Sequence, residues 1–147
     1  MVYDKETVNI LLVEDNPVDV RLTMEAFREC KKFIKFYNVK DGSDVFPFLR
    51  NEGEYTDKPR PDMIFLDLNL PKKNGHEVLK EIKTNEDFRT IPVVILTISK
   101  AEEDILKAYN LQANCFLQKP VKLDQFKKMV KSIDNFWFSF VEYVNNE

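Results

Sequence analysis

Runs of apolar residues alternate along the chain with stretches of helical periodicity. In three of these runs no polar residue interrupts the apolar ones, which is typical of strands buried on both faces of a parallel sheet. The sequence predicts five strands, at residues 8–13, 36–39, 63–66, 92–96 and 114–117. A predicted helix follows each strand, at about residues 17–32, 43–50, 76–84, 101–109 and 122–143. This order predicts an α/β domain with a doubly wound, five-stranded parallel sheet and helices on both faces.

Capping residues mark the predicted helix starts. Asn16 is suited to the N-cap and Pro17 to the first position of the first helix, and Ser43 is suited to the N-cap of the second. The apolar stripe of the first helix should be Val18, Leu22, Ala26 and Cys30. The inward face of the third helix should be Val78, Leu79 and Ile82. We interpret His76, the only histidine, as a solvated residue at the start of that helix.

Polar and charged residues follow four of the predicted strands at their carboxyl ends. They are Glu14, Asp15, Asp67, Thr97 and Lys119. In an open parallel α/β sheet these ends face the crevice where ligands bind. A lone aspartate at a strand end is more often a cap of the next loop, but the joint occurrence of carboxylates, a hydroxyl and an ammonium group indicates a site that handles phosphoryl groups.

The three carboxylates need a compensating charge if they meet at one edge. Two unit charges ~4 Å apart repel by roughly 4 kcal/mol at an effective dielectric constant of about 20. Mg²⁺ prefers hard oxygen ligands and shares its coordination with phosphoryl groups. An aspartate beside Mg²⁺ is also a usable nucleophile toward phosphorus. The sequence therefore predicts a magnesium site with Asp67 as the nucleophile.

Composition and charge restrict the class of protein. The chain has 147 residues, enough for one domain with a real core, and 44% hydrophobic with 32% charged residues is typical of a soluble globular protein. The net charge of −3 offers no electrostatic footprint for nucleic acid. No segment has the pattern of a signal peptide or a membrane span, so we expect a cytoplasmic protein without a membrane partner. Cys30 and Cys115 have no metal-ligand spacing.

Four motifs resemble those of response-regulator receiver domains of two-component signalling. They are Val13-Glu14-Asp15-Asn16, Asp67-Leu68-Asn69-Leu70-Pro71 with Gly75, Leu96-Thr97, and Phe116-Leu117-Gln118-Lys119-Pro120. The charged loop at residues 53–62 and the aromatic tail around Phe136 and Trp137 further resemble single-domain regulators associated with phytochrome-type histidine kinases. The resemblance implies a flavodoxin-like fold with strand order 2-1-3-4-5. It implies a single receiver domain over residues 1–147, with an extended last helix at about 122–143.

The resemblance also implies roles for the acidic residues. Asp67 would accept a phosphoryl group from a phosphohistidine of a sensor histidine kinase. Glu14 and Asp15 would hold Mg²⁺, together with Asp67 and the backbone carbonyl of Asn69. Glu14 stands where aspartate is commoner in the family, which lengthens the side chain that reaches the metal.

Three further residues would respond to the phosphoryl group in such a domain. Thr97 and Lys119 would bind its oxygens, and Phe116 would be the aromatic residue that swings when Thr97 moves. The Lys119–Pro120 peptide bond is usually cis in the family. Ile98 follows Thr97 where a small residue is typical, so access of the phosphodonor could be narrower.

The function implied is that of a phosphorylation-dependent response regulator rather than an enzyme, with at most weak autodephosphorylation. No output domain is expected after the last helix, so the signal would pass by contact or by onward phosphotransfer. One alternative is a haloacid-dehalogenase-type phosphatase, but Asn69 stands where those enzymes have a second aspartate. A second alternative is a flavodoxin-like redox or nucleotide-binding module. Such a module would need a glycine-rich loop that binds phosphate, but the chain has three glycines and no strand leads into such a loop. A degenerate receiver is disfavoured by the intact site residues.

The last predicted helix has more apolar residues than one face can bury. Its docking stripe would be Leu123, Phe126, Met129, Val130, Ile133, Trp137, Phe140, Val141 and Val144. Phe136, Phe138 and Tyr143 are left over, so we predict a twofold homodimer through the fourth and fifth helices. The alternative is that the tail frays or folds back on its own domain.

Overall fold

The computed structural model describes residues 7–30, 33–97, 115–118 and 123–133. Five parallel strands form one sheet in the order β2-β1-β3-β4-β5. The strands are β1 (Thr7–Val13), β2 (Phe33–Val39), β3 (Met63–Leu66), β4 (Val93–Thr97) and β5 (Cys115–Gln118). The α-helices are α1 (Pro17–Ala26), α2 (Val45–Leu49), α3 (Gly75–Thr84) and α5 (Leu123–Ile133). The predicted doubly wound sheet and its strand order are therefore confirmed.

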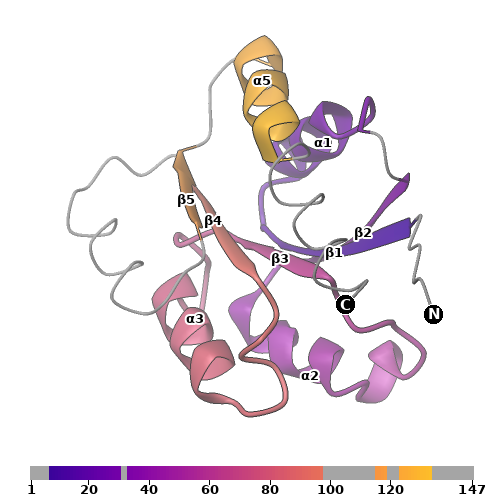
Figure 1. Ribbon diagram of the computed structural model, residues 1–147. Helices are drawn as coiled ribbons and strands as arrows, with labels where there is room; N and C mark the ends of the chain where they lie inside the picture. The colour runs from indigo at the N-terminus through magenta and orange to yellow at the C-terminus, as the bar shows by residue number, and fades with distance from the viewer. Residues whose placement is uncertain (1–6, 31–32, 98–114, 119–122, 134–147) are drawn as a thin grey trace.

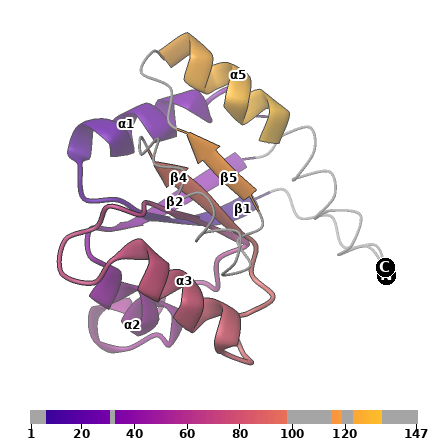
Figure 2. The same ribbon diagram turned by 90° about the vertical axis from the view of Figure 1, so that its left-hand side faces the viewer.

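The helices cover the two faces of the sheet in pairs. Helices α1 and α5 lie side by side on one face, and α2 and α3 lie on the other (Figures 1 and 2). Every residue of β3 is buried, as the unbroken apolar run predicts for a strand covered on both faces. The core is accordingly divided by the sheet: Leu11 and Leu66 belong to the cluster under α2 and α3, and Leu12 and Phe65 to the cluster under α1.

Helix α1 begins as predicted but buries a different set of residues. The Asn16 side chain accepts hydrogen bonds from the backbone N–H groups of Val18 and Asp19, with Pro17 in the first turn. The predicted stripe is wrong at its first position, because Val18 is 61% exposed. The side chains buried against the sheet here are Thr23, Ala26 and Phe27. Steps of four residues drift around a helix with 3.6 residues per turn, so a stripe spaced strictly by four leaves the buried face.

Two further boundaries differ from the prediction. β2 begins at Phe33, three residues before the predicted strand, and its Phe33 and Lys35 side chains are exposed. Asp41, not Ser43, caps the turn that follows: its side chain accepts a hydrogen bond from the Ser43 N–H at 2.9 Å, and a 3-10 turn at Gly42–Asp44 leads into α2. That hydrogen bond is the largest of the influences that lower the pKa of Asp41.

The charged segment at residues 51–62 is an ordered loop. It contains a 3-10 turn at Gly53–Tyr55. The Asn51 side-chain amide donates hydrogen bonds to the carbonyls of Tyr55 at 3.0 Å and Lys58 at 2.6 Å. Asp62 then exchanges hydrogen bonds with Asn9 at 2.8 Å, which fixes the end of the loop to β1.

Helix α3 has the predicted inward face, with Val78, Leu79 and Ile82 fully buried. His76 is half-buried in its first turn, so the prediction of a solvated side chain is wrong in degree. The predicted helix at 101–109 and the part of the last helix beyond Ile133 lie outside the described residues. Among the helices that the structure describes, none is long and apolar enough to cross a lipid bilayer.

Candidate functional site

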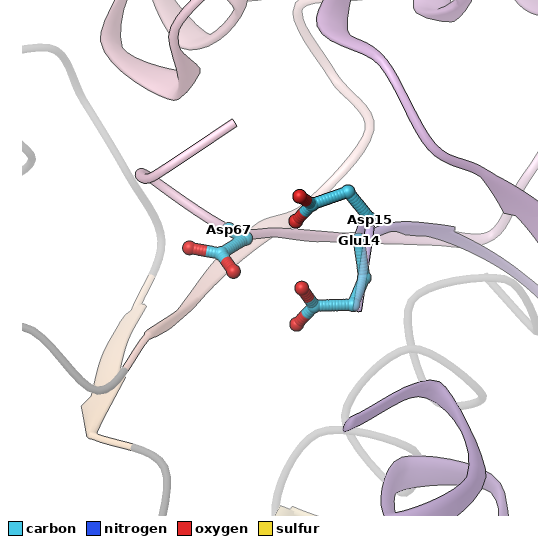
Figure 3. A group of neighbouring side chains, drawn as sticks. All are labelled: Glu14, Asp15 and Asp67. Carbon is cyan, nitrogen blue, oxygen red and sulfur yellow. The ribbon is translucent and has the colours of Figure 1, made fainter. Parts of the chain in front are cut away.

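Three carboxylates meet where β1 and β3 end. The two strands are neighbours, and Val13 is paired with Leu66, so the residues that follow them leave the sheet side by side. Glu14 and Asp15 follow β1, and Asp67 follows β3. One carboxylate oxygen of each lies within 4.8 Å of the others. Figure 3 shows the Glu14 and Asp15 side chains pointing from the end of β1 toward Asp67.

Backbone hydrogen bonds fix the two strand ends that carry the carboxylates. The Asp67 N–H donates to the Val13 carbonyl at 3.1 Å, which extends the pairing of β1 and β3 by one residue. The Glu14 N–H donates to the Val39 carbonyl at 3.0 Å on the other side of β1. The Asn69 N–H donates to Asp67 Oδ1 at 2.8 Å and turns the chain out of the sheet. The positions of the acidic side chains therefore follow from the sheet itself.

Burial strengthens the electrostatic repulsion among the three carboxylates. Glu14 is 2% exposed and Asp67 is 8% exposed, while Asp15 is exposed. Like charges repel more strongly where less water surrounds them. Carboxylate oxygens at this spacing are the ligands that hard divalent cations take in proteins, and a cation would remove the repulsion. The side chains present therefore fit a divalent metal.

A fourth acidic residue lies close to this group. Asp19 is half-buried, and its pKa is raised by burial and then by the negative charges of Asp67 and Asp15. Asp19 is not among the site residues predicted from the sequence. The signal was available, because Asp19 lies in the first turn of the helix that begins directly after the acidic strand end.

Two glycines allow close packing around the loop after β3. An added Cβ at Gly75 would lie 2.4 Å from the Asp67 carbonyl oxygen, and one at Gly42 would lie 2.4 Å from the Lys73 carbonyl oxygen. The Gly75 N–H also donates to the Leu68 carbonyl at 3.2 Å. Close contact of backbone with backbone requires glycine, so the first turn of α3 presses directly on the strand end that carries Asp67.

The remaining predicted site residues are placed only in part. β4 pairs with β3, with Ile95 opposite Leu66, so the end of β4 at Thr97 lies at the same edge as Asp67. Phe116 is in β5, paired with Ile95. The side chains of Thr97 and Phe116 lie outside the described part of the structure, as do Lys119, the Lys119–Pro120 bond and Ile98. Asn69 is exposed and follows Asp67 by two residues. The role of its backbone carbonyl as a metal ligand stays a prediction.

Comparison with known proteins gives a consistent result. The family model of the response regulator receiver domain matches residues 10–131. Response regulator Rcp1 of Synechocystis sp. is 46% identical over 132 residues, which cover 90% of each chain. The crystal structure of the phosphorylated cyanobacterial phytochrome response regulator RcpA has a TM-score of 0.85 and 46% identity, and the match covers 91% of this chain and 96% of that one.

A second solved structure bears on the acidic cluster. The Mn²⁺-bound form of response regulator Rcp1 has a TM-score of 0.81 and 46% identity, and the match covers 88% of this chain and 94% of that one. A divalent cation is thus bound by a protein that shares nearly half of its sequence with this chain.

Proposed function

Because the chain belongs to the response regulator receiver family, we propose that Asp67 accepts a phosphoryl group from a sensor histidine kinase and that this changes how the domain binds its partners. The observation that carries the proposal is the meeting of Glu14, Asp15 and Asp67 at the carboxyl edge of the sheet. Receiver domains are signalling proteins rather than enzymes. Weak autodephosphorylation is part of our proposal.

The transfer requires a nucleophile and acceptors of developing charge. A carboxylate oxygen of Asp67 attacks the phosphorus of a phosphohistidine, the new P–O bond replaces the P–N bond, and the electron pair of the P–N bond stays with the imidazole. The Asn69 N–H donates to Asp67 Oδ1 at 2.8 Å and so orients the carboxylate plane. The burial of Asp67 limits competition by water.

We assign Mg²⁺ to the acidic cluster, with Glu14, Asp15, Asp67 and the Asn69 carbonyl as its protein ligands. When bound, the cation would supply positive charge against the oxygens of the transferring group. The support is the set of carboxylate oxygens within 4.8 Å and the Mn²⁺-bound form of the related Rcp1. Oxygen donors alone, with no nitrogen or sulfur donor among them, favour Mg²⁺ over softer metals.

The partner that we propose is a phytochrome-type histidine kinase. The similarity to Rcp1, and to RcpA as a cyanobacterial phytochrome response regulator, supports this assignment. We propose a cytoplasmic location, because a histidine kinase takes the phosphoryl group that it transfers from ATP. We also retain the interpretation of residues 1–147 as a single receiver domain; the family model spans 10–131 of them.

The experiment that tests the function is labelling with a small phosphodonor. Incubation with acetyl phosphate and Mg²⁺ should add one phosphoryl group per chain, measured by intact mass, and addition of a chelator should prevent it. Phosphotransfer from purified kinases of the same cell then identifies the donor. Labelling at the full level without a divalent cation would contradict the proposal.

We propose that Thr97, Lys119 and Phe116 convert phosphorylation into a change of shape. The Thr97 hydroxyl and the Lys119 ammonium would bind the phosphoryl oxygens, and Phe116 would turn into the space that Thr97 leaves. Thr97→Ala should therefore accept phosphate with a yield within about twofold of the wild type and yet lose the phosphorylation-dependent gain in kinase or target binding. The measurement is a binding titration with and without phosphodonor, with Thr90→Ala, a threonine outside the site, as the control. A wild-type response of Thr97→Ala would place the coupling elsewhere.

Association is the second structural consequence that we propose. Phe136, Phe138 and Tyr143 lie outside the described residues, so the argument for a homodimer through the fourth and fifth helices rests on the apolar pattern of the sequence. Phe136→Ser with Phe138→Ser should shift sedimentation from dimer to monomer, because desolvated aromatic residues dominate such interfaces. The comparison is made with and without phosphodonor. Monomeric sedimentation of the wild type in both conditions would reject the dimer.

A further inference from the structure

Asn38 is a polar residue of β2 that contributes no ligand to the acidic cluster and yet contacts the strand end that carries it. In the parallel pairing of β1 with β2, Asn38 is opposite Leu12, and Val39 is opposite Val13. The next residue of β1 after this pair is Glu14. Asn38 therefore stands on the strand beside the acidic pair, on the side of β1 away from Asp67.

The side-chain amide of Asn38 bonds to three carbonyl groups. Its Nδ2 donates to the carbonyls of Leu12 at 2.9 Å, Glu14 at 3.1 Å and Val39 at 3.3 Å. Carbonyl oxygens only accept, so the NH₂ end of the amide must face them and its orientation is fixed by the network. The two hydrogens of the Asn38 amide are donated to three carbonyl oxygens, so one hydrogen is shared between two of them. Neither a carboxylate nor an aliphatic side chain could make these bonds.

Hydrogen bonds to β2 fix the backbone of Glu14 at both its N–H and its carbonyl group. The Glu14 N–H donates to Val39, and the Glu14 carbonyl accepts from Asn38, so the backbone of residue 14 is fixed to β2 although β1 ends at Val13. The Glu14 side chain is buried and has little freedom to compensate for a backbone shift. A change in the path of residue 14 would therefore change the spacing of its carboxylate from those of Asp15 and Asp67.

We propose that Asn38 is a positioning residue of the cation site: its amide holds the backbone of Glu14 so that the three carboxylates converge. The inference rests on the proposed function, because it gives the acidic cluster its role as the cation site. Groups that orient metal ligands from outside the coordination sphere commonly change metal affinity by about 10- to 100-fold when they are removed. Asn38 acts at a backbone carbonyl, so we place its effect at the lower end of that range.

The test is the affinity for Mn²⁺, measured by electron paramagnetic resonance of the free ion in a titration of the protein without phosphodonor. Asn38→Ala should bind Mn²⁺ on the order of tenfold more weakly than the wild type. Asn38→Ser, which keeps one donor on a shorter side chain, should lie between the two. The rate of labelling by acetyl phosphate should fall in Asn38→Ala at low Mg²⁺ and recover to within about twofold at saturating Mg²⁺, since the nucleophile is unchanged.

The matched control is Asn51→Ala. Asn51 also donates its amide to two backbone carbonyls, those of Tyr55 and Lys58, but it contacts no residue of the acidic cluster in these bonds. Asn51 has a φ of +56°, which alanine adopts less readily, so Asn51→Ala should lower the free energy of unfolding at least as much as Asn38→Ala and yet leave the Mn²⁺ affinity unchanged. Wild-type affinity in Asn38→Ala, or the same loss of affinity in both variants, would overturn the inference. Because Mn²⁺ binding needs no phosphoryl transfer, a wrong assignment of the phosphoacceptor would not alter this result.

Discussion

Asp67→Asn should not be phosphorylated at all by acetyl phosphate and Mg²⁺, whereas the wild type gains one phosphoryl group per chain. The amide oxygen of asparagine is a poor nucleophile toward phosphorus, and the substitution also removes one of the three carboxylates of the cluster. Intact mass spectrometry measures the difference directly. Retention of the full mass shift in this variant would show that another residue is the acceptor.

The loss of labelling should come with a gain in stability. Asp67 is 8% exposed and faces two other carboxylates, so its charge destabilises the protein without a cation. Asp67→Asn should raise the free energy of unfolding in the presence of a chelator by about 1 kcal/mol. Replacement of a functional residue often stabilises a protein in this way, because the residue is kept for its function and not for stability. Asp57→Asn, in the exposed part of the loop at 51–62, is the control and should change neither labelling nor stability. A destabilised Asp67→Asn variant would contradict the electrostatic argument.

Gly75→Ala should lower the free energy of unfolding by about 2–3 kcal/mol, the cost of forcing extra atoms into a filled space. Its Cβ would lie 2.4 Å from the Asp67 carbonyl oxygen and 2.7 Å from the Leu68 Cα. Both contacts are with backbone, which cannot rotate away as a side chain can, so α3 or the end of β3 must move. Labelling of Asp67 should slow as well, because the moved backbone carries the nucleophile. Denaturant unfolding and a time course of labelling measure the two effects.

Gly53 provides the contrast for this prediction. A Cβ at Gly53 would have no heavy atom within 4 Å, but the residue has a φ of +56°. Gly53→Ala should therefore cost about 1 kcal/mol through backbone strain alone, and Gly53→Asn less, with unchanged labelling. Equal losses of stability for Gly75→Ala and Gly53→Ala would refute the steric explanation.

The inner strands were predictable from the sequence because burial on both faces leaves an unambiguous pattern, whereas the half-exposed edge strand β2 begins three residues before its predicted start. Met63 to Leu66 have no polar residue and form β3, and the Asn16–Pro17 pair marks the start of α1. The acidic cluster was also predictable, since residues that follow neighbouring parallel strands must meet at one edge. The strand ends alone predict that the three carboxylates converge, and the structure brings one oxygen of each within 4.8 Å of the others.

Features that depend on how elements touch were not predictable in the same way. The buried face of α1 includes Thr23, a polar residue whose hydroxyl bonds to the Asp19 carbonyl at 2.8 Å and so adds no unsatisfied group to the core. Asp41 and Ser43 are both good caps, and only the local backbone decides between them. Asn38 is exposed in an edge strand, where an isolated asparagine carries no signal of the three carbonyls around its amide.

The position of β1 and β3 inside the sheet also determines how the domain opens. The N–H groups that join these two strands to each other should exchange with solvent only when the whole domain unfolds, while the outer strand β2, and with it the β1 amides that donate to β2, can open at lower cost. Partial opening at that edge leaves Asp67 paired to Val13, and the repulsion among the carboxylates persists. Removal of divalent cations should for this reason lower the melting temperature of the domain in one cooperative transition, and hydrogen exchange should report the same decrease in protection for all the N–H groups that join β1 to β3.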